Sequence, residues 1–192
     1  MRTTSGYILY NILGWKIKGV FPGIKKSILI IAPHTSVWDW LIVTLFLNQI
    51  GVKYKILYKK EFLIFPINIV MKLLGSIPVD RKGKRNNLIF QIAGLLKNNE
   101  ELCIALSPEG TRYLKTQWEK GFYYISKRTN VPIIAGYIDY TKKEIGIKGV
   151  IHETDNIKTV MQEINECYQN VGAKHPEKFS LDIADKENLK GN

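Results

Sequence analysis

Short apolar runs alternate with longer amphipathic segments along most of the chain. The apolar runs are rich in β-branched residues and bounded by turn residues, which favours buried strands over helices. The longer segments repeat apolar residues every three or four positions, which is typical of helices with one buried face. We therefore predict strands over 27–32, 52–58, 76–79, 102–106, 131–138 and 145–151, and helices over 40–49, 66–74, 86–97, 116–128 and 157–171.

This order of elements indicates the fold class. Strands that alternate with helices are joined by crossover connections, which produce a largely parallel sheet. Such a sheet buries both faces, so helices must cover it on each side. We predict a single α/β domain with a mostly parallel mixed sheet between two layers of helices. In such sheets, binding sites form beyond the carboxyl ends of the strands.

The two ends of the chain differ from its middle. Residues 6–21 have a wide apolar face, so we predict an amphipathic helix within 1–22 that either lies in a lipid interface or packs on its own domain. The α/β domain is predicted over 23–172, followed by a polar tail over 173–192 that frays. No apolar run reaches the ~20 residues that span a bilayer, and no signal-peptide layout opens the chain. We therefore expect no membrane crossing.

Charge is the feature of the composition that narrows the function. Among 192 residues, 28 Lys and Arg stand against 17 Asp and Glu, a formal net charge of +11. This excess favours nucleic acid, an anionic membrane surface or anionic substrates as partners, although a solvated lysine-rich surface has the same composition. Cys103 and Cys167 are too few for a disulfide framework and are expected to be reduced, as in the cytoplasm.

The first candidate for chemistry follows the most apolar predicted strand. His34 comes just after that strand, and Asp39 lies five positions later. If His34 precedes a helix whose first turn contains Asp39, the carboxylate can hold one imidazole nitrogen and leave the other as a general base. A loop histidine beside a carboxylate that stabilises the helix N-terminus has the same spacing.

Two later strands are followed by candidate anion sites. The turn 107–112 combines the forked guanidinium of Arg112 with Gly110, whose backbone N–H can approach an anion closely. Arg81 begins a basic run over 81–85. Each stretch can bind phosphate or be a solvated turn. The basic run has no aromatic residues for base stacking, so nucleic acid is not expected as a partner.

No metal or bound cofactor is expected either. The sequence has no His and Cys residues at metal-ligand spacing. It also lacks both common glycine-rich nucleotide loops.

Four ordered stretches together carry a family resemblance. They are His34-Thr-Ser-Val-Trp-Asp39, Gly75-Ser-Ile-Pro-Val-Asp-Arg81, Pro108-Glu-Gly-Thr-Arg112 and Val131-Pro132-Ile-Ile. They resemble the motif blocks of the glycerolipid acyltransferases, the 1-acylglycerol-3-phosphate (lysophosphatidic acid) acyltransferase superfamily. The similarity spans about residues 28 to 138. The short length and the stretch Trp118…Gly121-Phe-Tyr-Tyr look like the compact bacterial members without transmembrane helices.

The resemblance implies a reaction and assigns roles to residues. A fatty acyl group would pass from acyl-CoA or acyl carrier protein to the hydroxyl of a lysophospholipid such as 1-acylglycerol-3-phosphate, with no further cofactor. His34 would be the general base and Asp39 its orienting partner, and Pro132 would shape the acyl-donor side. The acceptor's phosphate or head group would be bound by Arg81, Glu109, Gly110, Thr111 and Arg112.

The resemblance also implies a location and leaves alternatives. The enzyme would be cytoplasmic and peripheral on the inner face of the cytoplasmic membrane. The chain departs from the family pattern at Pro33, Ser107 and Tyr113. These changes flank the motif blocks, so they bear on which head group the acceptor pocket takes. The alternatives are an acyltransferase for a non-phosphate lysolipid, such as an amino-acid lipid, and a non-catalytic basic module that binds membrane or RNA.

Overall fold

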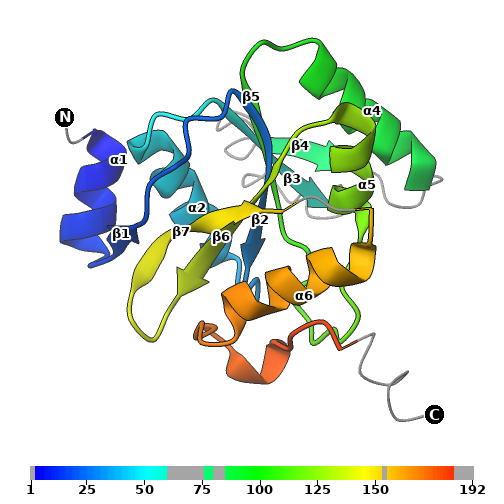
Figure 1. Ribbon diagram of the computed structural model, residues 1–192. Coiled ribbons are helices and arrows are strands. Elements are labelled where there is room, and N and C mark those ends of the chain that lie inside the picture. The colour runs from blue at the N-terminus through cyan, green and yellow to red at the C-terminus, as the bar shows by residue number, and fades with distance from the viewer. Residues whose placement is uncertain (1–2, 60–75, 80–84, 153–154, 184–192) are drawn as a thin grey trace.

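A seven-stranded sheet forms the centre of the protein (Figure 1). The computed structural model describes residues 3–59, 76–79, 85–152 and 155–183. Within them the strand order is β1-β7-β6-β2-β5-β3-β4, and all neighbours are parallel except β6 and β7. The strands are β1 (Lys16–Lys18), β2 (Lys26–Ala32), β3 (Tyr54–Lys59), β4 (Ser76–Val79), β5 (Leu102–Leu106), β6 (Ile133–Asp139) and β7 (Glu144–Ile151). The predicted α/β class with a mostly parallel mixed sheet is confirmed.

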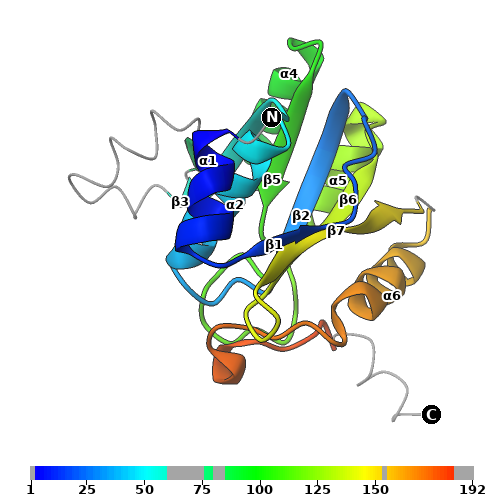
Figure 2. The same cartoon turned by 90° about the vertical axis from the view of Figure 1, so that its left-hand side faces the viewer.

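Helices cover both faces of this sheet. The helical segments are α1 (Thr4–Tyr7), the π-helical η1 (Ile8–Ile12), α2 (Trp38–Gln49), α4 (Arg85–Lys97), α5 (Gly121–Thr129), α6 (Ile157–Tyr168) and the 3-10 turn η3 (Pro176–Lys178). The α1–η1 segment and α2 lie on one face, whereas α5 and α6 lie on the other (Figure 2). Helix α4 packs in the same core as α5 and α6. None of the helices in the described residues is long and apolar enough to span a membrane.

The central strand β2 shows why two helical layers form. Ile28 and Ile30 are buried in the core beneath α4, α5 and α6, whereas Leu29 and Ile31 are buried in the core beneath α2. Because side chains alternate along a strand, an unbroken apolar run needs apolar cover on both faces. Strand β2 pairs with β5 on one side and β6 on the other. Its carboxyl end therefore lies in the middle of one edge of the sheet.

The predicted helix over residues 6–21 is wrong beyond Ile12. Gly14 has a φ of +69°, a left-handed conformation that ends helices. The N–H of Lys16 then donates to the carbonyl of Lys143 at 2.8 Å, and β1 pairs in parallel with β7. Leu9 is fully buried in the core that includes α2. The segment therefore packs on its own domain, and its end adds an edge strand that the helical spacing did not predict.

The predicted fraying of the tail is wrong for residues 173–183. The buried carboxylate of Asp182 accepts the N–H of Trp118 at 3.1 Å, and the Trp118 indole donates to the carbonyl of Ser180 at 3.0 Å. The backbone N–H of Asp182 also donates to the side chain of Asn165, on α6, at 3.0 Å. These bonds hold the segment against α6 and the loop before α5. Residues beyond 183 lie outside the described residues.

Most other predicted elements are present with small shifts at their ends. The helix predicted over 116–128 begins later, at Gly121, since the preceding residues carry the contacts of Trp118 with the C-terminal segment. The helix predicted over 66–74 lies outside the described residues.

Candidate active site

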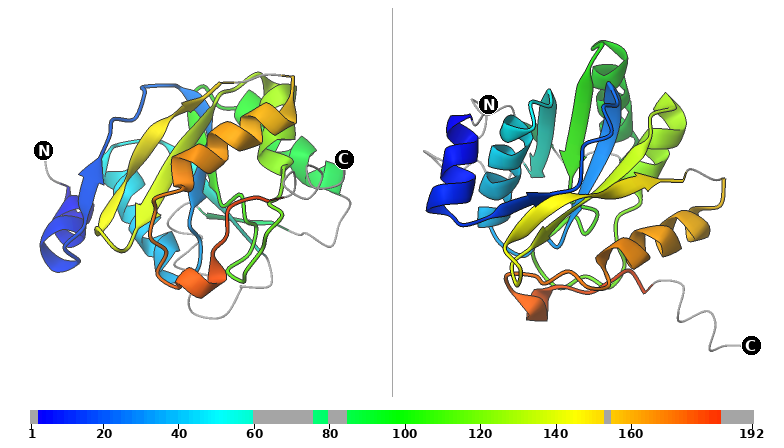
Figure 3. Two further views of the ribbon diagram at one scale, coloured as in Figure 1. Left: turned by 60° about the horizontal axis from the view of Figure 1, so that its bottom comes forward. Right: turned by 60° about the vertical axis from the view of Figure 1, so that its left-hand side comes forward.

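Three parallel strands bring the candidate residues to one edge of the sheet. His34 follows β2, the turn 107–112 follows β5, and Tyr140 follows β6. Because β5 and β6 both pair with β2 in parallel, the three loops leave the sheet at the same end. The C-terminal segment 173–183 crosses this end as well (Figure 3).

His34 and Asp39 are paired as their spacing predicted. Nδ1 of His34 lies 3.2 Å from Oδ2 of Asp39, which is in the first turn of α2. The Asp39 side chain is 2% exposed, whereas that of His34 is 29% exposed. The carboxylate is thus shielded from water while the imidazole stays accessible to a substrate. The roles of base and orienting partner remain predictions.

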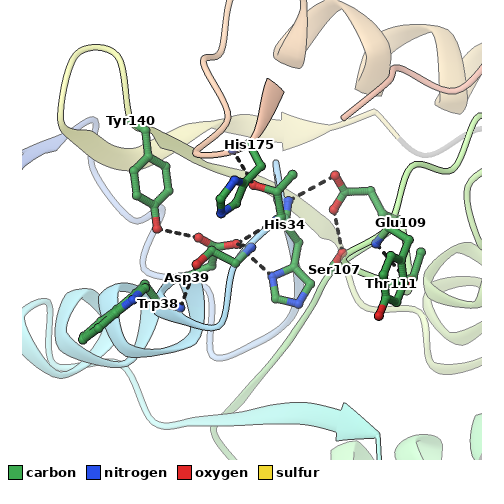
Figure 4. A network of polar contacts seen from close by, with 11 residues as sticks. His34, Trp38, Asp39, Ser107, Glu109, Thr111, Tyr140 and His175 are labelled. Carbon is green, nitrogen blue, oxygen red and sulfur yellow. Dashed lines mark hydrogen bonds and ion pairs between the residues drawn. The ribbon is translucent and has the colours of Figure 1, made fainter. Parts of the chain in front are cut away.

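A network of donors fixes the Asp39 carboxylate (Figure 4). Its Oδ2 accepts the backbone N–H groups of Thr35 at 2.9 Å and Ser36 at 2.8 Å. Its Oδ1 accepts the hydroxyl of Tyr140 at 2.6 Å. A carboxylate accepts hydrogen bonds and donates none, so the His34 nitrogen facing it carries the proton. Nε2 of the neutral ring is then unprotonated, as a general base requires.

Tyr140 is a site residue that the sequence reasoning missed. Burial raises the pKa of the Tyr140 phenol above its ordinary value, and its hydrogen bond to Asp39 raises it further. The hydroxyl therefore keeps its proton and donates it to the carboxylate. The ring is also held edge-on by Trp15, with centroids 4.9 Å apart. Its position just beyond the predicted strand 131–138 could have indicated a site residue, because sites form where parallel strands end. Nothing in the sequence, however, showed that this strand lies next to β2.

Glu109 joins the loop after β5 to the loop after β2. Its Oε1 accepts the backbone N–H of His34 at 3.1 Å, and its Oε2 accepts the hydroxyl of Ser107 at 2.8 Å. The residue is 3% exposed, and burial raises its pKa to about 7, although the bond from the His34 N–H opposes this shift. Both carboxyl oxygens thus contact protein donors, which positions the backbone of His34.

The rest of the turn is built around a glycine. Gly110 has a φ of +69°, where a side chain would be strained, and its N–H donates to the carbonyl of Ser107 at 3.2 Å. That N–H, which we predicted to approach an anion, closes the turn instead. The Thr111 hydroxyl likewise accepts the N–H of Tyr113 at 3.3 Å.

Arg112 lines an open pocket beside His34. The pocket has a volume of about 300 Å³ and is lined by Thr35, Ser36, Val37, Arg112, Tyr113, His175 and Lys178. Arg81 lies outside the described residues. Among the residues that are described, no three His, Cys, Asp or Glu side chains gather closely enough to hold a metal ion.

Pro132 does not lie at this site. It precedes β6, and its carbonyl accepts the N–H of Ile28, near the beginning of β2, at 3.0 Å. In a parallel pair, residues at the beginning of a strand lie at the edge opposite to those that follow it. The role implied for Pro132 on the acyl-donor side therefore has no support in its position.

Comparison with known proteins agrees with the motif blocks. The family model described as Acyltransferase matches residues 16–139, well over half of the chain. The matched region contains every candidate site residue from His34 to Arg112. No curated protein matches the chain. Family membership implies an acyl donor and a lipid acceptor. The chain belongs to the glycerolipid acyltransferase family and is an acyltransferase.

Proposed function

We propose that this acyltransferase transfers a fatty acyl group from acyl-CoA or acyl carrier protein to the hydroxyl of a lysophospholipid such as 1-acylglycerol-3-phosphate. The observation that carries the proposal is the His34–Asp39 pair at the carboxyl edge of the sheet. One ring nitrogen is held by a buried carboxylate, and the other is left for the acceptor hydroxyl. Arg112 in the adjacent pocket and Arg81 are proposed to attract the acceptor's phosphate.

In the proposed mechanism, Nε2 of His34 removes the proton from the acceptor hydroxyl as its oxygen attacks the thioester carbonyl carbon. Asp39, 3.2 Å from Nδ1, stabilises the imidazolium that forms. The carbon–sulfur bond then breaks, and the thiolate leaves with the proton from the imidazolium. The steps use no cofactor beyond the acyl donor.

Direct transfer without an acyl-enzyme is supported by the state of the cysteines. Cys103 is 2% exposed inside β5, and burial raises its pKa to about 11. Burial also raises the pKa of Cys167. Thiols that stay protonated at neutral pH are poor nucleophiles.

We further propose that the enzyme works at the cytoplasmic surface of an anionic membrane. Large apolar side chains on either side of the pocket are exposed: Val37 54%, Trp38 57%, Tyr113 77% and Leu114 57%. The ammonium of Lys174 lies 5.5 Å from the Trp38 ring. Exposed aromatic groups beside cations suit the interface between lipid head groups and acyl chains.

The test is release of free thiol from a long-chain acyl-CoA, with and without lysophosphatidic acid. Thiol release that requires both the acceptor and His34 would support acyl transfer with His34 as the base. If His34→Ala releases thiol as fast as the wild type, the assignment of the base is wrong. If wild type is inactive, acyl carrier protein donors and other lysolipids are tested next, and inactivity with all of them contradicts the proposed substrates.

A further inference from the structure

The C-terminal segment 173–183 lies outside the family match yet reaches the candidate site. The backbone N–H of His175 donates to the Thr35 hydroxyl at 3.2 Å, and Thr35 in turn donates its own N–H to Asp39. Figure 4 shows His175 close to Asp39 and its neighbours. The segment is therefore attached to the loop that carries His34.

This attachment brings a second source of positive charge into the pocket. Arg112 comes from the loop after β5, whereas His175 and Lys178 come from the C-terminal segment. The remaining lining residues are Thr35, Ser36, Val37 and Tyr113, so none of the described residues that line the pocket is Asp or Glu. Guanidinium and ammonium groups with nearby hydroxyls form the donor set that phosphate prefers in proteins.

The backbone at Lys178 is ordered by contacts of the C-terminal segment. Its N–H closes η3 by donating to the carbonyl of His175 at 2.9 Å. The next residue, Phe179, packs against Trp118 with ring centroids 6.3 Å apart. A cation on an ordered segment loses less conformational entropy on binding than one on a frayed tail. The Glu177 carboxylate lies 3.7 Å from Nδ1 of His175 and offsets any positive charge on that ring, so Arg112 and Lys178 supply most of the positive charge of the pocket lining.

We propose that Lys178, which lies outside the family match, adds a second cation to the phosphate site already proposed at Arg112 and determines the enzyme's preference for a phosphate-bearing acceptor. The proposal rests on the proposed function, since it assigns a head-group site to that reaction. The phosphate of a lysolipid is only a few bonds from the reacting hydroxyl, and the pocket begins at the two residues after His34. The phosphates of acyl-CoA lie a whole pantetheine arm away from the thioester.

The test compares Lys178→Met with a matched control, Lys158→Met. Lys158 is exposed and follows β7, which runs antiparallel to β6, so it lies at the opposite edge of the sheet. Both variants lose one surface charge, and their thermal unfolding is compared with wild type. Turnover is measured with 1-acylglycerol-3-phosphate and with the corresponding monoacylglycerol, and glycerol 3-phosphate binding is measured by calorimetry.

We expect Lys178→Met to lower kcat/KM for the phosphate-bearing acceptor about tenfold, with less than about a twofold change for monoacylglycerol. Affinity for glycerol 3-phosphate should fall in parallel, while Lys158→Met changes neither. The proposal is overturned if Lys178→Met lowers kcat/KM equally for both acceptors. It is also overturned if the variant binds glycerol 3-phosphate as tightly as the wild type and its kinetics with acyl-CoA are unchanged.

Two further outcomes separate the possible failures. Lys178→Met could instead raise the KM for acyl-CoA but not for the dephospho form of that donor. That result would mean that the pocket binds a phosphate of the donor and not of the acceptor. Wild-type protein that binds glycerol 3-phosphate through Lys178 but transfers no acyl group would contradict the proposed reaction and leave the phosphate site supported.

Discussion

The candidate site has two halves with different physical character. Around Asp39 and Glu109, polar groups are buried and held by several directional hydrogen bonds. Around Lys178, cations line an open pocket. Buried hydrogen bonds are sensitive to the loss of one atom and insensitive to salt, whereas exposed charges are screened. We therefore propose that the buried half serves the chemistry and that the open half selects the substrate.

The largest effect is expected from His34→Ala. Loss of a general base typically costs roughly 10²–10⁴ in rate, and we expect kcat to fall by about 10³ with little change in stability. The matched control is His152→Ala, because His152 is exposed and paired with Glu163 after β7, away from the site. Stopped assays of thiol release measure both variants. A similar loss in both would show that the effect is not specific to the site.

Asp39→Asn tests whether the buried carboxylate acts through the imidazole. The amide keeps the shape but cannot accept the whole set of bonds from Thr35, Ser36, His34 and Tyr140. We expect kcat to fall roughly a hundredfold or more, with the KM values for both substrates nearly unchanged. Steady-state kinetics provides the measurement. A variant that raises KM and keeps kcat would assign Asp39 to substrate binding instead.

Glu109→Gln should remove a pH dependence of stability. Burial raises the pKa of Glu109 from an ordinary 4.5 to about 7. Between these values the unfolded chain loses the proton while the folded protein keeps it, so this group's contribution to stability falls as pH rises. The shift corresponds to a decrease of about 3 kcal/mol between pH 4.5 and pH 7.

Urea unfolding of wild type and Glu109→Gln across this pH range measures that difference. At low pH the wild type should have the higher free energy of unfolding. This advantage over the variant should shrink as the pH rises. Parallel curves would mean that Glu109 ionises in the folded protein as it does in the unfolded chain.

Tyr140→Phe removes one donor from Asp39 and leaves the ring against Trp15. Hydrogen bonds to charged groups contribute about 1.5–3 kcal/mol, so we expect kcat to fall about tenfold. KM should stay within about twofold, since the hydroxyl acts through Asp39 and His34. The pH profile of kcat should also shift, because the carboxylate that faces the imidazole changes its environment. An unchanged profile and rate would leave Tyr140 with a packing role.

The smallest effect separates the two halves most clearly. With the phosphate-bearing acceptor, the loss of kcat/KM in Lys178→Met should shrink to about twofold when the ionic strength rises from about 0.05 M to about 0.5 M. The reason is that salt screens charges in an open pocket. The loss in His34→Ala should not change over the same range. Kinetics of both variants at the two salt concentrations provide the measurement. A salt-independent loss in Lys178→Met would indicate a structural role for that residue.

Local patterns determined much of the fold and half of the site. Alternating apolar runs predicted the strands and most helices, since periodicity and burial are properties of short segments. The contact between His34 and Asp39 was also predictable, because it depends on one loop and the first turn of the helix that follows. The helix predicted over 6–21 failed where a longer-range contact competed, since pairing of β1 with β7 replaces its second half.

Tertiary structure decided the contacts between distant segments. Tyr140 lies 101 positions from Asp39, and His175 lies 140 positions from Thr35. These pairs meet because β2 lies between β5 and β6 and because Asp182 holds the C-terminal segment on the domain. Strand order results from the packing of the whole chain, so no local pattern encodes it. The sequence by itself determined most of the elements and the pairing of His34 with Asp39, and the tertiary structure decided which distant side chains join that pair.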